Sequence, residues 1–237
     1  MKIAVTRLHE KDEGTSNLFN QYGLEAVIIP TIQSQEPSDT SSIDNLIENI
    51  KSQKIDILIF TSTLGVLKFF NKIADIPRNI RIISVGPKTA QKVIQFGHHT
   101  EVLDSYNSRH FAEYIGKYAP DKTIGIARAN VPDPGIVNTL ESLGATVIEG
   151  TCYELVETPN KLKNNILNKN IDCVVFTSTK SFLASKLASS DVRDVITVAI
   201  GPKTAENMEK HGVTADLIGS GTLDSCAVLL KNLNNFK

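Results

Sequence analysis

The side chains best placed to do chemistry in this sequence are hydroxyl and ammonium groups that occur in two repeated motifs. The segment Gly86 to Ala90 reads GPKTA, and Gly201 to Ala205 repeats it. Thr-Ser-Thr also occurs twice, after the apolar runs that end at Phe60 and Phe176. Each motif stands between a strand-like and a helix-like run. The donors that we expect to bind an anionic ligand are Thr61, Ser62, Lys88, Thr89, Thr177, Ser178, Lys203 and Thr204.

A structural role would explain any one of these motifs. Thr or Ser before a helix caps it, which contributes about 1 kcal/mol, and Pro87 and Pro202 suit a first helical position. Ligands, however, bind at the carboxyl edge of open α/β sheets, where helix amides face anionic groups. A nucleotide phosphate loop needs Gly-Lys-Ser/Thr, and here Pro intervenes. Four such motifs therefore predict two sets of donors facing a shared cleft.

Two arginines and one tyrosine extend this set. Arg7 and Arg128 close matching strand-like runs, where each either is solvated or pairs with a ligand carboxylate. Tyr153 lies in the segment 150–158. This segment follows the second strand of the second half, just as the segment 31–38 follows the second strand of the first half. A phenol with an ordinary pKa near 10 is a neutral donor at pH 7. Packing at a domain junction explains Tyr153 equally well on spacing alone.

The other reactive side chains predict neither a metal site nor a cofactor. No Ser/His/Asp order and no paired carboxylates stand out, and Asp56 and Asp172 at matching strand starts are interpreted as structural. Neither the histidines nor the cysteines have the spacing of metal ligands or of a redox pair. These residues are His9, His98, His99, His110, His211, Cys152, Cys173 and Cys226.

The elements that must position these groups form a duplicated α/β pattern. Ten strand-like runs fall into two sets of five, separated by amphipathic segments such as the one that carries Leu46, Ile47 and Ile50. The number of positions between Gly23 and Gly144 is the same as that between Arg7 and Arg128, so these residues correspond in the two halves of the sequence. Strands separated by helices predict parallel sheets covered on both faces. Each repeat is too long for a solenoid unit, so the pattern indicates a duplicated domain.

Composition limits the partners of the protein. The 237 residues suffice for one large or two small domains, and the net charge of −1 gives no reason to expect nucleic-acid binding. No apolar run approaches the roughly 20 residues of a membrane span. We therefore expect a cytoplasmic protein that binds neither membranes nor nucleic acid.

The ordered set of motifs resembles the uroporphyrinogen-III synthase family, whose members close the linear tetrapyrrole hydroxymethylbilane without a cofactor. The segments AVTR, FTST, VGPKTA, ESLGATVIEGTCYEL, IGPKTA and SGTLDSCAVLL follow the order of that family over essentially the whole chain. The resemblance implies two α/β/α domains with parallel five-stranded sheets and swapped repeats. It assigns 1–33 and 157–237 to one domain, 38–149 to the other, and 34–37 and 150–156 to a two-stranded linker. The repeats alone would divide the chain near residue 120.

The same resemblance implies the activity and the site. The family removes water from its substrate and inverts ring D through a spiro intermediate, which makes it a carbon-oxygen lyase. Tyr153 matches the family tyrosine proposed to assist departure of the hydroxyl, and Thr89 and Thr204 match threonines of its glycine-led motifs. The other donors named above, with Arg7 and Arg128, are assigned to substrate carboxylates. A linear tetrapyrrole as ligand, a monomeric chain and transient contact with hydroxymethylbilane synthase are further expectations.

Two other functions remain open on the sequence. A two-domain module could bind a tetrapyrrole or polycarboxylate without turnover, and Tyr153 favours catalysis over this reading. A nucleotide-sugar or phosphate transferase is disfavoured because no metal-binding carboxylate pair and no phosphate loop are found.

Overall fold

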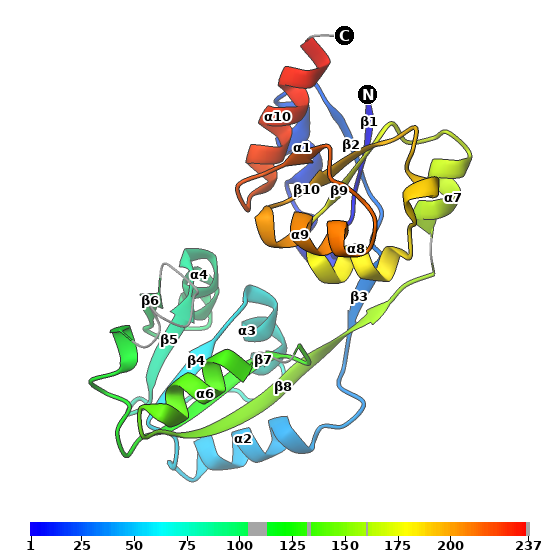
Figure 1. The fold of residues 1–237 in the computed structure, drawn as a ribbon. Helices are drawn as coiled ribbons and strands as arrows, with labels where there is room; N and C mark the ends of the chain where they lie inside the picture. The colour runs from blue at the N-terminus through cyan, green and yellow to red at the C-terminus, as the bar shows by residue number, and fades with distance from the viewer. Residues whose placement is uncertain (104–112, 132–133, 160, 236–237) are drawn as a thin grey trace. The chain divides into compact units, whose positions relative to one another are not determined.

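The computed structural model describes residues 1–103, 113–131, 134–159 and 161–235, which form two compact units (Figure 1). Unit 1 comprises Met1–Ser34 and Val156–Lys237, and unit 2 comprises Gln35–Leu155. Unit 2 is therefore an insertion in the chain of unit 1, and the chain passes between the units twice.

Unit 1 contains a parallel sheet in the order β11-β10-β9-β1-β2. The first strand pairs with a strand from the C-terminal part, with Ile3 opposite Cys173. This confirms the swapped arrangement that the resemblance implied. The strands are β1 (Lys2–Val5), β2 (Glu25–Ile28), β9 (Cys173–Phe176), β10 (Ile196–Ala199) and β11 (Leu217–Ile218).

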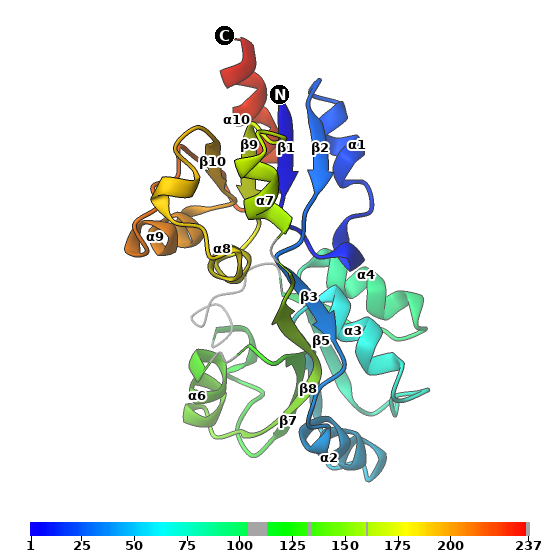
Figure 2. The same cartoon turned by 90° about the vertical axis from the view of Figure 1, so that its right-hand side faces the viewer.

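Helices cover both faces of this sheet (Figure 2). On one face, α1 and α10 contribute Phe19 and Leu230 to a buried cluster with Ile3 and Val175. On the other face, α7, α8 and α9 pack against a second cluster that includes Val174. The helical elements of unit 1 are η1 (His9–Lys11), α1 (Thr15–Asn20), α7 (Lys161–Leu167), α8 (Thr179–Ser185), η2 (Ser189–Asp191), α9 (Pro202–Lys210) and α10 (Leu223–Asn235).

In the described ranges, the second sheet has the order β3-β8-β7-β4-β5-β6 and is parallel from β8 to β6. Its five parallel strands agree with the five-stranded sheet that the resemblance implied, and the polar segment at Ile32 forms β3 beside the twelve-residue β8, in the place of the two-stranded linker. Glu154 of β8 also accepts hydrogen bonds from the Ser38 amide and hydroxyl, at 3.0 and 2.8 Å. The strands are β3 (Ile32–Gln35), β4 (Ile57–Phe60), β5 (Arg81–Val85), β6 (Glu101–Leu103), β7 (Thr123–Ala129) and β8 (Thr146–Glu157).

The helices of unit 2 pack closely on the sheet. At Gly125 and Gly150, an added Cβ would come within 2.7 and 2.5 Å of the Leu46 side chain, so these glycines permit the approach of α2. Ile136 and Leu140 of α6 join a buried cluster with strand residues such as Ile59. The helices are α2 (Ser41–Lys51), α3 (Thr63–Phe70), α4 (Pro87–Gln95) and α6 (Pro134–Ser142).

Matching aspartates fix the starts of neighbouring strands. Asp56 Oδ2 accepts a hydrogen bond from the Thr123 amide at 2.9 Å, and Asp172 Oδ2 accepts one from the Lys2 amide at 2.7 Å. Each bond joins the start of one parallel strand to the start of the next. The prediction that both aspartates are structural is confirmed.

No helix in the described ranges combines the length and the apolar character that crossing a membrane requires.

Candidate active site

The predicted site residues of unit 2 follow the carboxyl ends of adjacent parallel strands. Thr61 and Ser62 come after β4, and Lys88 and Thr89 open the helix after β5. Arg128 lies near the end of β7, and β8 brings in Tyr153. The order β8-β7-β4-β5 places these segments along one edge of the sheet. This is the edge at which α/β proteins bind ligands.

Ser62 and Tyr153 lie next to each other at this edge. Ser62 has extended backbone and caps α3, because its Oγ accepts a hydrogen bond from the Gly65 amide at 3.0 Å. The Tyr153 hydroxyl lies 3.3 Å from the same Oγ, and the Tyr153 side chain is only 4% exposed. The phenol is therefore packed in the sheet edge while its oxygen reaches the start of a helix.

A β-bulge in β8 helps to set the register of Tyr153. Arg128 is opposite Thr151 on β8, whereas the next residue, Ala129, is opposite Tyr153. The extra residue on β8 reorients the strand locally, as bulges commonly do beside binding sites. Nothing in the sequence pattern of this segment indicates the bulge.

Unit 1 carries the matching serine cap with a different environment. Ser178 caps α8 in a reciprocal capping box with Ser181, whose amide lies 3.0 Å from Ser178 Oγ. The Thr177 hydroxyl donates to the Thr6 carbonyl at 2.7 Å. The Thr6 hydroxyl lies 3.0 Å from Ser181 Oγ. The Thr177 proton is therefore already used within the protein, and its predicted role as a donor to substrate stays a prediction.

The GPKTA motifs start α4 and α9, with Pro at the first helical position in both, as predicted. Gly86 has φ of 80°, a conformation that favours glycine, so glycine lets the chain turn into α4. Gly201 differs, because its φ of −168° is open to any residue. Glycine is favoured there by close packing, since an added Cβ would lie 3.3 Å from the Gly221 amide nitrogen.

The two threonines of these motifs share an unusual environment. Thr89 and Thr204 are 4% and 5% exposed, whereas Lys88 and Lys203 are exposed. In the described ranges, neither threonine hydroxyl has a side-chain hydrogen bond, and neither oxygen is among the fully enclosed atoms that lack a partner. Each hydroxyl is therefore accessible at a helix start, where a ligand can reach it.

Both predicted arginines are anchored on their own chain. Arg128 Nε forms an ion pair with Glu149 Oε1 at 2.8 Å, and the Arg128 side chain is only 12% exposed. Its buried Nη1 has no hydrogen-bond partner within the described ranges. Arg7 Nε donates to the Lys11 carbonyl in the turn after β1. These contacts hold each guanidinium near a strand end and leave part of it for a ligand.

The three cysteines are buried, and burial makes their thiols unreactive. Burial raises the pKa of Cys152, next to Tyr153, to about 12, and that of Cys226 to about 11. Burial also raises the pKa of Cys173. In the ranges given above, no group of three or more His, Cys, Asp or Glu side chains could hold a metal ion.

Sequence reasoning missed three residues that shape the site. Thr6 and Ser181 are buried hydroxyls that connect β1 to α8, and Glu149 fixes Arg128. Thr6 immediately precedes the predicted Arg7, and Glu149 lies in the segment used for the resemblance, but no spacing rule connects either one to its partner.

Comparison with known proteins identifies matches along nearly the whole chain. A sequence profile described as "Uroporphyrinogen-III synthase HemD" matches residues 13–225. A "Uroporphyrinogen-III synthase" of Chlorobaculum parvum is 26% identical over 91% of this chain and 92% of its own length. A "Porphyrin biosynthesis protein HemD" of Ruminiclostridium josui is 26% identical over 94% of this chain, which spans 47% of that relative.

Solved structures share the fold. A mutant uroporphyrinogen III synthase from the extremely thermophilic bacterium Thermus thermophilus superposes with a TM-score of 0.68 at 16% identity, with both chains fully covered. The uroporphyrinogen-III synthetase from Helicobacter pylori gives a TM-score of 0.66 at 17% identity, over 98% of this chain and 99% of the other.

Proposed function

Because the chain belongs to the uroporphyrinogen-III synthase HemD family, we propose that it converts hydroxymethylbilane to uroporphyrinogen III, with loss of water and inversion of ring D. The reaction makes it a carbon-oxygen lyase of tetrapyrrole biosynthesis. The observation that carries the proposal is the family match over residues 13–225, together with a tyrosine hydroxyl at the ligand-binding edge of a parallel sheet.

The first step breaks the bond between the hydroxymethyl carbon and its oxygen. The hydroxyl needs a proton to leave as water, and the electron-rich pyrrole supplies the electrons, so that an azafulvene forms. Tyr153 is a neutral donor that can protonate or hydrogen-bond the departing oxygen. Ser62 holds the phenol at the edge of the sheet through the contact of 3.3 Å.

The second step joins the azafulvene carbon to the substituted carbon of ring D, which gives the spiro intermediate. Fragmentation and closure in the other direction then invert ring D, and a proton leaves the ring carbon. These steps need a fixed conformation of the chain more than a strong acid or base. We assign this positioning to donors that bind the substrate carboxylates in each unit.

The carboxylate donors differ in what they offer. Lys88 and Lys203 are exposed cations, Thr89 and Thr204 are largely buried residues that offer a hydroxyl, and the helix starts add backbone amides. Arg128 offers a guanidinium whose Nε is already bound to Glu149. The remaining donors in this assignment are Arg7, Thr61, Ser62, Thr177 and Ser178.

Product analysis tests the proposal. The purified chain is supplied with hydroxymethylbilane generated in place, and the uroporphyrinogen isomers are separated. We expect the type III isomer in excess over a reaction without the chain. Only the symmetric type I isomer, which forms by spontaneous closure, would overturn the proposed activity. Tetrapyrrole binding together with type I product alone would instead support a non-catalytic binding module.

A further inference from the structure

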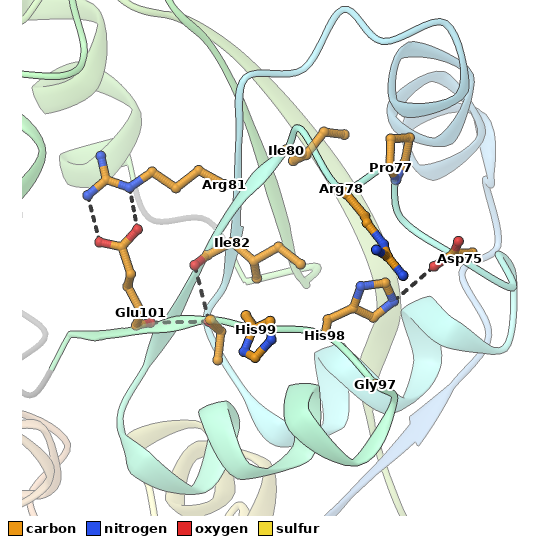
Figure 3. A pocket seen from close by; sticks show the side chains of 11 residues that line it. Asp75, Pro77, Arg78, Ile80, Arg81, Ile82, Gly97, His98, His99 and Glu101 are labelled. Carbon is orange, nitrogen blue, oxygen red and sulfur yellow. Dashed lines mark hydrogen bonds and ion pairs between the residues drawn. The ribbon is translucent and has the colours of Figure 1, made fainter.

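Unit 2 contains a cavity of about 630 Å³ at the opposite edge of its sheet from the site described above (Figure 3). Its walls include Arg81 and Glu101, the first residues of β5 and β6. The proposed active-site residues, in contrast, follow the carboxyl ends of the strands. The volume falls in the range of small-molecule pockets. The cavity is therefore separate from the proposed catalytic site, and the inference drawn from it does not depend on the proposed function.

Two of the charged groups in the wall neutralise each other. Arg81 forms a bidentate ion pair with Glu101, and its Nη2 lies 2.6 Å from Glu101 Oε2. Tyr114 donates a further hydrogen bond to the same carboxylate at 2.7 Å. Arg81 also lies over the ring of Tyr118, 4.1 Å from its centroid. This pair is thus part of the framework and is not free to bind a ligand.

With Arg81 paired, Arg78 is the other arginine of the cavity wall. It is exposed, and within the described part of the chain it has no ion pair. Figure 3 shows its guanidinium group beside the ring of His98 and near Asp75. Apart from Glu101, which is paired with Arg81, Asp75 is the acidic group among the described residues of this wall, and its side chain is 83% exposed.

His98 is held in a fixed position next to Arg78. Its Nε2 lies 3.3 Å from Asp75 Oδ1, and its side chain is only 13% exposed. The ring stacks on Phe70 with a centroid distance of 5.2 Å. Asp75 Oδ1 is itself fixed by the Ile76 amide at 2.9 Å. His99, which also lines the cavity, adds a second imidazole.

Part of the wall is apolar. Ile80 and Ile82 are each 5% exposed, and Pro77 lines the same cavity. A guanidinium and imidazoles beside an apolar surface match a ligand that carries an anionic group on a compact hydrocarbon body. Guanidinium binds phosphate and carboxylate with the same paired geometry.

We propose that this cavity binds a small organic anion, whose phosphate or carboxylate group contacts Arg78 and the imidazoles of His98 and His99. The body of the ligand packs against Pro77, Ile80 and Ile82. Asp75 holds His98 in place and at the same time weakens anion binding through its own charge.

The proposal is tested with the full chain, titrated with inorganic phosphate and, separately, with acetate, while amide chemical shifts are recorded by NMR. Ionic strength is kept constant, because added salt screens exposed charges. We expect saturable shifts at Gly97 to Thr100 with at least one of the two anions. Stronger binding of phosphate or of acetate identifies the class of the anionic group.

Two substitutions with opposite expected effects make the test specific. Arg78→Gln should weaken binding about tenfold, the value of one charge-assisted contact, and Asp75→Asn should strengthen it several-fold. Both side chains are exposed, so both variants should fold. Arg193→Gln in unit 1 is the matched control for loss of one positive charge, and it should leave binding unchanged. Shifts that do not saturate, or equal affinities in all four proteins, would overturn the proposal.

Discussion

The hydroxyl oxygen of Tyr153 lies 3.3 Å from Ser62 Oγ, although 91 positions separate the two residues in the chain. The contact joins β8 to the start of α3. Since Ser62 Oγ also accepts the Gly65 amide, the position of the phenol depends on the cap of a helix. A group fixed in this way can meet a substrate oxygen without first being ordered, which favours a positioning mechanism.

Replacing Tyr153 with Phe should slow turnover while largely sparing substrate binding. The variant keeps the buried ring and removes only the hydroxyl. We therefore expect kcat to fall by about one to two orders of magnitude, which is at or below the lower end of the rate effect of a general acid. Steady-state kinetics with isomer analysis measures this. Unchanged kcat would remove Tyr153 from the proposed role.

Tyr22→Phe is the matched control for that variant. The Tyr22 hydroxyl donates to Asp224 at 2.7 Å within unit 1, where it links α10 to the end of α1. Its loss removes one hydrogen bond on the surface of the protein and should leave kcat unchanged.

Thr89→Val and Thr204→Val should weaken substrate binding without lowering stability. Both residues are largely buried, and their hydroxyls make no side-chain hydrogen bond within the described ranges, so a methyl group of similar size should be nearly neutral in the free protein. We expect KM to rise several-fold in each variant. Denaturation curves and kinetics together check this.

Thr197→Val provides the contrast. Its buried hydroxyl donates to the Thr214 carbonyl at 2.9 Å, so the same change should cost about 1–3 kcal/mol of stability. The idea that substrate satisfies Thr89 and Thr204 would be refuted if their valine variants lost as much stability as this control and kept a normal KM.

Gly86→Ala should destabilise unit 2 through backbone strain alone. Gly86 has φ of 80°, and an added Cβ would meet no atom within 4 Å. With ψ of 156°, this backbone lies in a region essentially limited to glycine, which costs other residues about 1–3 kcal/mol. Gly201→Ala should instead act by contact, because its Cβ would lie 3.3 Å from the Gly221 nitrogen and φ is unstrained. Chemical denaturation measures both, and unaltered stability of Gly86→Ala would contradict the strain argument.

The Arg81–Glu101 pair should make unit 2 sensitive to acid. The hydrogen bond from Arg81, together with that from Tyr114, lowers the pKa of Glu101. A lowered carboxyl pKa stabilises the fold above the ordinary value of about 4.3, and this stabilisation is lost as pH falls through the folded-state pKa. Glu101→Gln should therefore be less stable than the parent at pH 7 and show a flatter loss of stability below about pH 4.3.

Denaturant midpoints between pH 2.5 and 7 measure this difference. Glu141→Gln on α6 is a suitable control, since Glu141 is exposed and has no ion pair within the described ranges. Parallel pH profiles for the parent and Glu101→Gln would show that the pair contributes nothing.

Local signals in the sequence predicted the strand ends and the helix starts. Ser62 and Ser178 cap helices, and Pro87 and Pro202 occupy first helical positions, because these roles depend on the residue and its immediate neighbours. The duplication of these signals also predicted the parallel sheets. The swap of the first strand came from the resemblance, since pairing of β1 with β9 leaves no mark on either strand alone.

Contacts between distant segments were beyond the sequence. The polar run at Ile32 pairs with β8 as a linker strand, which the resemblance implied and no local pattern indicated. Thr177 donates to a carbonyl 171 positions away, which a motif cannot reveal. Ile94, in the last turn of α4, is 60% exposed, although its apolar character alone would favour burial.

The pairing of β1 with β9 also constrains the order in which the protein folds. During synthesis the whole of unit 2 is made before Cys173–Phe176 exists. Domains generally fold as units and from the N-terminus, so unit 2 can complete its sheet while β1 and β2 have no central partner. The sheet of unit 1 closes late and through contacts distant in sequence, which slow folding. β1 is thus made before unit 2 and yet is among the last strands to pair.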